Sequence, residues 1–301
     1  MITPKIPANE QERLRALYEY DILDTMPEKD FDYLTMIASQ ICDTPISLVT
    51  IIDESRQWFK SNYGVDIRET DREYSFCAHA INTPQTIMVV PDSRLDERFA
   101  DNPFVTNEPN AIFYAGVPLV TENGFALGTL CIIDNKPRTL NEEQFEALRA
   151  LSNQVVKLLE LRKKNKELVE TKEALEKSMD LYTQTSHVAC VGGWEIDLIR
   201  NKFSWTNVTK EINEVPADFV PELRKAIDFY KEGDDRNQIR LAFSNAMDHG
   251  EPFDIESRII TAKGKEKWVR TKGEAKNLNG LYTRVYGILQ DISDQKMRNT
   301  K

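Results

Sequence analysis

Apolar residues follow two different spacings in the first half of the chain. Two helices are predicted from apolar residues at helical spacing. The first begins after Asn9, and the second follows a capping box at Thr25–Glu28 with Pro27 just inside it. Apolar and β-branched stretches then predict a short helix at 74–81 and strands at 46–53, 57–64, 86–90, 112–120 and 125–133. An Asn-Gly step at 123–124 predicts a hairpin between the last two strands. We therefore expect an α+β domain in which helices cover one face of an antiparallel sheet.

A long helix is predicted next. A capping box at Thr139–Glu142 opens a stretch without Pro or Gly as far as Gly192, enough for a helix of about forty residues. Its apolar residues fall into heptads, with Leu158, Asn165, Lys172 and Met179 at position a, and Leu161, Leu168, Leu175 and Tyr182 at position d. The polar residues Asn165 and Lys172 are typical of a parallel coiled coil held in one register, which predicts a homodimer. The alternative is one amphipathic helix packed on its own domain, but residues 162–177 are charged on every face except the a/d seam.

The second half of the chain predicts another antiparallel sheet. Residues 192–206 alternate as a hairpin, with Trp194, Ile196 and Leu198 on one face. Helices are expected at 207–215, 222–230 and 236–249, and strands at 253–261, 267–276 and 282–290. Gly250 stops the last helix. This order of elements predicts five strands with helices on one side of the sheet.

Composition narrows the possible partners and the compartment. The 301 residues are 41% hydrophobic and 29% charged, which suits two folded domains. A formal net charge of −10 argues against a nucleic-acid backbone or an anionic membrane surface as the main partner. No apolar stretch is long enough to span a membrane and no signal peptide is visible, so we expect a cytoplasmic protein. The four cysteines are widely spaced, which predicts reduced thiols and no metal site.

Several motifs resemble two families of sensory domains. RQWFKSNYGVDIRETDREYSFCAHAI (56–81) and FYAGVPLVTENGFALGTLCIID (113–134) resemble the GAF domain of bacterial signalling proteins. GGWEID (192–197) and DISDQK (291–296) resemble the opening and closing motifs of a PAS domain. The resemblance implies a GAF-like domain at 10–158, a coiled-coil linker at 159–186 in a helix that begins near 140, a PAS-like domain at 187–296 and the start of an outgoing helix at 297–301.

The resemblance implies a sensory input region. In these families an effector follows such a pair of domains, most often a histidine kinase and sometimes a diguanylate cyclase. The sequence contains no Walker, nucleophile-elbow or zinc-protease motif and no phosphoacceptor helix, so no catalytic residue is expected in it. We expect a fragment of a two-component sensor histidine kinase, with its kinase domain or a response regulator as the downstream partner. The alternatives are a stand-alone dimerisation module, and an enzyme that reduces methionine sulfoxide with cysteine chemistry.

A small-molecule pocket is expected in the GAF-like domain. The resemblance implies that it is lined by Phe76, Cys77, His79, Phe113, Tyr114 and Cys131, and core packing is the alternative for each of them. Cys77 and His79 suggest a bilin attachment or a metal pair, but side chains two apart on a helix point about 200° away from each other. Bilin-binding relatives also carry His directly after the Cys, whereas Ala78 intervenes here. A redox pair of Cys77 with Cys131 stays open, since the sequence does not give their separation.

The sequence does not identify a cofactor. The Asn-Lys-Phe string of cyclic-nucleotide GAF domains occurs only at 201–203, inside the PAS-like hairpin, and the flavin motif G-x-N-C-R-F-L-Q is absent from the sequence. A haem would need a ligating His near His249. That residue directly precedes Gly250, which is typical of a helix C-terminus, so haem is not expected.

Two further groups of residues are singled out in the PAS-like domain. Asp291 and Ser293, in the closing motif, are candidate signal-coupling residues together with Asn165 and Lys172. The carboxylate would tie the last strand to the outgoing helix as a hydrogen-bond acceptor. The tryptophans at 194, 205 and 268 are expected to form the surface of the sheet.

Overall fold

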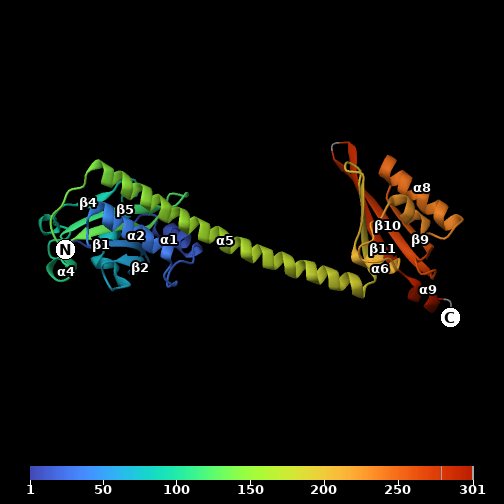
Figure 1. Cartoon of the computed structure of the whole chain (residues 1–301), viewed down its shortest axis with the longest axis horizontal. Helices are drawn as coiled ribbons and strands as arrows, with labels where there is room; N and C mark the ends of the chain where they lie inside the picture. The colour runs from blue at the N-terminus through green and yellow to red at the C-terminus, as the bar shows by residue number, and fades with distance from the viewer. Residues whose placement is uncertain (279, 300–301) are drawn as a thin grey trace. The chain divides into compact units, whose positions relative to one another are not determined.

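The computed structural model describes residues 1–278 and 280–299 of the chain (Figure 1). It contains two compact units, Met1–Thr171 and Lys172–Lys301. Within the described part of the chain, none of the helices combines the length and apolar character needed to cross a membrane. Asn279, in the predicted turn, and residues 300–301 of the predicted outgoing helix lie outside the described residues.

The first unit is built on a six-stranded antiparallel sheet. In spatial order its strands are β3 (Glu69–Asp71), β2 (Arg56–Tyr63), β1 (Ile46–Ile52), β6 (Ala126–Asp134), β5 (Phe113–Val120) and β4 (Met88–Val90). The predicted strands are therefore confirmed, and β5 and β6 pair as the predicted hairpin. Gly124 in its turn has φ of +83°, a conformation that glycine adopts without the usual steric cost.

Helices cover both faces of this sheet, so the prediction of a single covered face is wrong. Helices α1 (Glu10–Glu19), α2 (Lys29–Cys42) and the first part of α5 (Glu142–Val188) pack in one cluster with Phe113 and Leu119. On the opposite face α3 (Phe76–Ala80), together with Val105 of α4 (Pro103–Thr106), packs with Tyr114. The central strands are buried along their whole length because each face has its own cover.

Two predicted capping boxes are corrected by the structure. Helix α2 begins at Lys29 without a side-chain cap, because Thr25 donates to the carbonyl of Ile22 instead. Helix α5 begins at Glu142, behind a reciprocal pair in which the amide of Gln144 donates to Asn141 Oδ1 (2.9 Å) and the amide of Asn141 donates to Gln144 Oε1 (3.1 Å). The real box therefore lies two residues beyond the predicted one.

The length of α5 agrees with the sequence pattern, since it runs for 47 residues without a break. Its buried residues are Leu148, Ser152, Val155 and Leu159, all in the first eighteen positions. The three apolar residues form a stripe in the core of the first unit, and the Ser152 hydroxyl donates to the carbonyl of Pro118 (3.3 Å). Beyond Leu159 the helix buries no further side chain within the chain.

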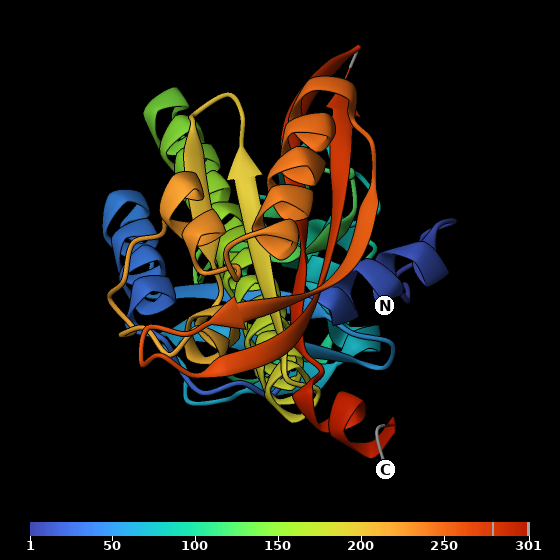
Figure 2. The same ribbon diagram turned by 90° about the vertical axis from the view of Figure 1, so that its right-hand side faces the viewer.

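The second unit is a five-stranded antiparallel sheet, as predicted. In spatial order its strands are β8 (Lys202–Trp205), β7 (Val191–Asp197), β11 (Leu281–Asp291), β10 (Glu266–Leu278) and β9 (Phe253–Ile260). Helices α6 (Asn207–Ile212), α7 (Leu223–Asp228) and α8 (Asp234–His249) pack with it in one core, and Figure 2 shows α8 beside the strands. Gly250 ends α8 in the left-handed conformation, and α9 (Ser293–Asn299) follows β11.

The tryptophans do not share one surface, which corrects the sequence prediction. Trp194 belongs to the core between the sheet and its helices, and Trp205 packs against the same core. Trp268 lies on the opposite face, because its neighbour Val269 points into the core and successive strand residues alternate. There it contacts the side chains of Arg258 and Lys296.

Candidate functional site

A narrow cavity lies in the first unit, between the sheet and α3. Three of the six predicted pocket residues line it, namely Phe76, Cys77 and Tyr114. Its volume is about 50 Å³. A space of that size holds a few water molecules, whereas pockets for drug-sized ligands measure about 300–1,000 Å³.

The other three predicted residues lie elsewhere. Phe113 packs on the opposite face of the sheet, because it alternates with Tyr114 along β5. His79 hydrogen-bonds through Nε2 to the carbonyl of Ile2 (3.0 Å) at the edge of the unit. Cys131 lies buried behind Cys77 and does not line the cavity.

Polar residues that the sequence pattern did not single out also line the cavity. Gln57, Thr70 and Ser75 contribute to its wall. The hydroxyl of Ser75 accepts a hydrogen bond from the amide of Ala78 (2.9 Å), which caps α3, and it contacts the amide side chain of Gln57. A Ser directly before a short helix is a capping signal, and that signal could have identified Ser75.

Thiols and hydroxyls cluster around Cys77, which lines the cavity. Cys77 Sγ lies 3.7 Å from Cys131 Sγ, and the Tyr114 hydroxyl lies 3.3 Å from Cys77 Sγ. Burial alone would raise the pKa of Cys77, but hydrogen bonding with Cys131, Thr129, Thr50 and Tyr114 lowers it below its ordinary value. Burial raises the pKa of Cys131 well above its ordinary value.

The described residues of the two units contain no ready set of metal ligands. Across residues 1–278 and 280–299, no three His, Cys, Asp or Glu side chains gather as they would around an ion. His79 and Cys77 point to different surroundings, as their spacing on a helix predicted. The two residues therefore do not form a joint site.

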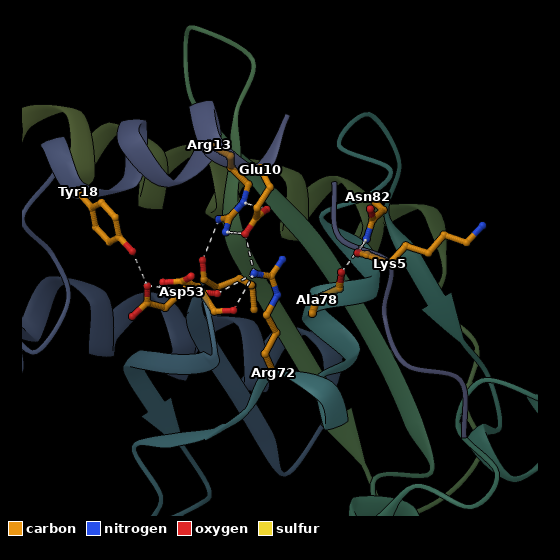
Figure 3. A network of polar contacts seen from close by, with 10 residues as sticks. Lys5, Glu10, Arg13, Tyr18, Asp53, Arg72, Ala78 and Asn82 are labelled. Carbon is orange, nitrogen blue, oxygen red and sulfur yellow. Dashed lines mark hydrogen bonds and ion pairs between the residues drawn. The ribbon is translucent and has the colours of Figure 1, made fainter. Parts of the chain in front are cut away.

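An ion network fixes α1 to the sheet (Figure 3). Arg13, whose side chain is 1% exposed, makes two hydrogen bonds of 2.8 Å to Glu10 and donates a third to the carbonyl of Ile52 (2.8 Å). Arg72 approaches the same Glu10 carboxylate at 2.6 Å. Burial alone would raise the pKa of Glu10, but the two guanidinium groups hold it below its ordinary value.

The chain before α1 lies against α3. The side-chain amide of Asn82, just beyond α3, donates to the carbonyls of Lys5 and Ala78, each at 2.9 Å (Figure 3). His79 holds Ile2 in the same way. The helix that carries Cys77 therefore has direct contacts with the N-terminal segment.

The end of α1 contacts α5. The Tyr20 hydroxyl donates to Glu160 (2.5 Å), and Lys163 pairs with Glu19 (2.5 Å). Lys166 pairs with Asp21 at 2.6 Å. The contacts on α5 thus extend beyond its buried stripe to residue 166.

From Leu161 onward α5 presents a seam of exposed apolar residues. The residues at the d positions are exposed, at 56% for Leu161, 67% for Leu168, 60% for Leu175 and 61% for Tyr182. Asn165, at position a, is also exposed. Lys172 lies 3.7 Å from Glu176 on the same helix. Tyr182 also lines a space with Gly193 and Phe253 of the second unit. The three leucines of the seam remain exposed.

The core of the second unit is filled by its own side chains. The space beside Trp194 and Tyr230 measures about 20 Å³, which is room for about one water molecule. The Tyr230 hydroxyl bonds to Thr271 (2.8 Å), whereas the buried Trp194 Nε1 has no hydrogen-bond partner. His249 is exposed at the end of α8. This geometry gives no room for a haem or a flavin in the core as it stands.

Asp291 and Ser293 join the last strand to α9. Asp291 Oδ1 accepts from the Ser293 amide (3.0 Å) and hydroxyl (2.7 Å), and its other oxygen lies 3.2 Å from Lys267 Nζ. Ser293 Oγ in turn accepts from the amide of Trp268 (3.1 Å). Burial alone would raise the pKa of Asp291, but Ser293 and Lys267 lower it below its ordinary value.

Comparison with known proteins places these two units in families. The model of the GAF domain matches residues 26–159, and a model of the PAS fold matches residues 205–289. A cyclic di-GMP phosphodiesterase of Pseudomonas aeruginosa is 43% identical over 138 residues, which are 46% of this chain and 23% of that protein. A blue-light-activated histidine kinase of Brucella ovis is 29% identical over 141 residues, 46% of this chain and 27% of that protein. The chain thus spans about a quarter of the length of these relatives.

Two solved structures have regions that match this chain. The GAF domain of an Acinetobacter phosphoenolpyruvate-protein phosphotransferase is 16% identical, covers 50% of this chain and 93% of its own, and has a TM-score of 0.38. A sensory box histidine kinase/response regulator of Burkholderia thailandensis is 22% identical, covers 40% and 89%, and has a TM-score of 0.33. The chain therefore contains a GAF domain followed by a PAS fold, in the order that its sequence motifs indicated.

Proposed function

We propose that this chain is the sensory input region of a longer signalling protein, and that two copies pair in parallel along α5. The observation that carries the proposal is the exposed seam at Leu161, Leu168, Leu175 and Tyr182, on the helix that continues from the GAF domain into the second unit. Heptad spacing suits pairing of this seam with the same seam on a second copy of the chain.

The position of the seam around α5 supports this pairing. At 100° per residue, the stripe that packs on the GAF core, Leu148 to Leu159, points roughly 120° away from the seam where the heptads begin at Leu158 and Leu161. The GAF domain therefore holds the helix from one side and also contacts Leu158, and the seam is open from Leu161 onward. A change in the GAF core then acts on the same helix that pairs the two copies.

The effector in this proposal is a histidine kinase, with a response regulator as its partner. The kinase relatives support this choice. The second candidate is an enzyme of cyclic di-GMP metabolism, favoured by the relative that is 43% identical; this class includes the diguanylate cyclases. In either case α9, joined to β11 through Asp291 and Ser293, is the exit toward the effector. A stand-alone dimerisation module is the remaining alternative.

Substitution of the two polar residues at position a of the seam tests whether helix pairing transmits a signal. In the full-length gene product, Asn165→Ile with Lys172→Leu should tighten the dimer at least tenfold, because two polar layers of the seam become apolar. We expect the effector activity to become fixed at one level, since pairing that is locked in one arrangement no longer responds. Dimer dissociation and effector turnover are the measurements.

The matched control places the same residue types off the seam. Glu170→Ile with Lys177→Leu changes two exposed f positions of the same heptads and should leave both the dimer and the effector activity near the unchanged protein. A seam variant that behaves like this control would contradict the proposed transmission through α5.

A second variant tests the exit from the PAS domain. Asp291→Asn should lower the stability of the second unit by about 1 kcal/mol at pH 7, or roughly 4 °C in Tm, because the charge opposite Lys267 is lost. The pKa of Asp291 is lowered in the folded state, so its stabilisation is present above the unfolded pKa and is lost as the pH falls through the folded pKa. The Tm values of the Asp291→Asn variant and of the unchanged protein should therefore converge in acid. Asp218→Asn, at an exposed residue, is the control; equal Tm values at pH 7 would refute the contribution of Asp291.

A further inference from the structure

We propose that Cys77 is a peroxide-reactive thiol, and that its oxidation closes a Cys77–Cys131 disulfide inside the GAF domain. The site comprises the narrow cavity, the two thiols and the hydroxyl groups around them. The substrate is a small hydroperoxide, with hydrogen peroxide as the type that fits the cavity.

The first argument is the distance between the two sulfur atoms. Cys77 lies in the first turn of α3 and Cys131 lies on β6, and their Sγ atoms are 3.7 Å apart. A disulfide bond is about 2.05 Å long, so the two atoms have to approach by about 1.7 Å. Helix α3 has only five residues, which makes it the element that moves more easily against the sheet. The pair is thus close enough to bond without rearrangement of the domain.

The second argument is access. Cys77 lines the cavity, whereas Cys131 lies behind it and does not. With a volume of about 50 Å³, the cavity admits molecules close to water in size. Hydrogen peroxide has two heavy atoms and belongs to this class. A small oxidant therefore meets Cys77 first, and Cys131 is placed to react afterwards from the protected side.

The third argument is the reactivity of the Cys77 sulfur. The thiolate is the nucleophilic form of cysteine, and a thiolate needs hydrogen-bond donors when it is buried. The Tyr114 hydroxyl lies 3.3 Å from the sulfur. Hydrogen bonding with this hydroxyl and with Cys131, Thr129 and Thr50 offsets burial and lowers the pKa of Cys77 below its ordinary value. Cys42, which is buried without such donors, has its pKa raised to about 11 by burial.

The reaction balances in two steps. The Cys77 sulfur attacks one oxygen of hydrogen peroxide, the O–O bond breaks, and the hydroxide released takes up the thiol proton as water. Cys77 is then a sulfenic acid. The Cys131 sulfur attacks the Cys77 sulfur, the S–O bond breaks and the S–S bond forms, and the second hydroxide takes up the Cys131 proton as a second water. Two thiols are oxidised by two electrons while one peroxide is reduced to two waters.

Oxidation would affect the rest of the chain through the contacts of α3. His79 and Asn82 connect this helix to Ile2 and Lys5, in the segment that leads into α1. The end of α1 contacts α5 through Tyr20 and Glu160. Movement of α3 toward Cys131 therefore acts on a contiguous set of contacts that reaches α5. Only this consequence rests on the proposed function; the oxidation itself does not.

The test uses the full chain with Cys190→Ser, because Cys190 is exposed and would react from the surface. The native protein is treated with hydrogen peroxide, denatured, alkylated with N-ethylmaleimide and digested for mass spectrometry. We expect the peptides of Cys77 and Cys131 to be joined, with Cys42 fully alkylated as the internal reference. Cys77 and Cys131 that are alkylated to the same extent as Cys42 would overturn the proposal.

Two variants separate the roles of the thiols. With Cys131→Ser, Cys77 should stop at the sulfenic acid, which dimedone traps when the oxidised protein is denatured in its presence, with at least ten times more adduct at Cys77 than at Cys42. With Cys77→Ser, Cys131 should remain reduced; oxidation of Cys131 at the unchanged rate would overturn the order of reaction.

A comparison of two oxidants tests the cavity as the route to the thiols, without any substitution of Cys77 or Cys131. tert-Butyl hydroperoxide, which is bulkier, should oxidise the thiols at least ten times more slowly than hydrogen peroxide, and equal rates would overturn the cavity as the route. Absence of the disulfide refutes this inference and leaves the seam of α5 untouched. A chain that stays monomeric refutes the proposed function and leaves the thiol chemistry measurable.

Discussion

A chain that carries Leu168→Asp with Leu175→Asp is expected to be monomeric at concentrations where the unchanged chain is a dimer. Both leucines are exposed in the single chain and lie at successive d positions. Across the pair, four leucine side chains would leave the interface at about 2 kcal/mol each, and four carboxylates would face one another. The dimer should therefore weaken by at least three orders of magnitude, as measured by sedimentation equilibrium.

The control for this result is Leu181→Asp. Leu181 is 62% exposed on the same helix, but it occupies position c, away from the seam. We expect this variant to dimerise like the unchanged chain. Equal dissociation constants for the double variant and the unchanged chain would show that α5 does not pair along the seam.

The second large effect is expected in the GAF domain, where Arg13→Ala should lower the free energy of unfolding by about 3 kcal/mol, or roughly 9 °C in Tm. Arg13 is almost wholly buried, and its loss leaves the Ile52 carbonyl without this donor and Glu10 without two of its hydrogen bonds (Figure 3). Thermal and urea unfolding of the full chain provide the measurement.

An exposed ion pair is the matched control. Arg149→Ala removes a 3.0 Å pair with Glu146 on the surface of α5, and such pairs contribute about 0–1 kcal/mol. The pH dependence adds a second check. The pKa of Glu10 is lowered in the folded state, so its stabilisation is present above the unfolded pKa and falls away as the pH drops through the folded pKa. The loss caused by Arg13→Ala should shrink in acid, and a loss below 1 kcal/mol at pH 7 would contradict the role of Arg13.

These experiments separate two tasks of α5. The stripe at Leu148, Val155 and Leu159 holds the GAF domain, whereas the seam is available to a second copy. Because the two surfaces lie on different sides of one helix, a seam variant should leave GAF stability unchanged. Likewise, Arg13→Ala should change the stability of the domain and leave the residues of the seam in place.

The sequence by itself determined the elements and their order. Strands β1, β5 and β6, the hairpin at Gly124, the stop at Gly250 and the length of α5 follow from periodicity and turn residues that act over a few positions. The seam was also visible in the sequence, since heptad spacing is a local pattern. Three of the six predicted pocket residues line one cavity, because a short helix over a sheet brings them to one wall.

Only the tertiary structure decided what those elements bring together. The 3.7 Å between Cys77 and Cys131 joins residues 54 positions apart, and no local pattern encodes such a distance. The same holds for Arg13, a charged residue buried because the Ile52 carbonyl and Glu10 bind it. Phe113 was assigned to the wrong face for a related reason. Alternation separates it from Tyr114, but only the helices packed on each side decide which face is the cavity. Long-range packing, and not local propensity, thus sets the chemistry of this GAF domain.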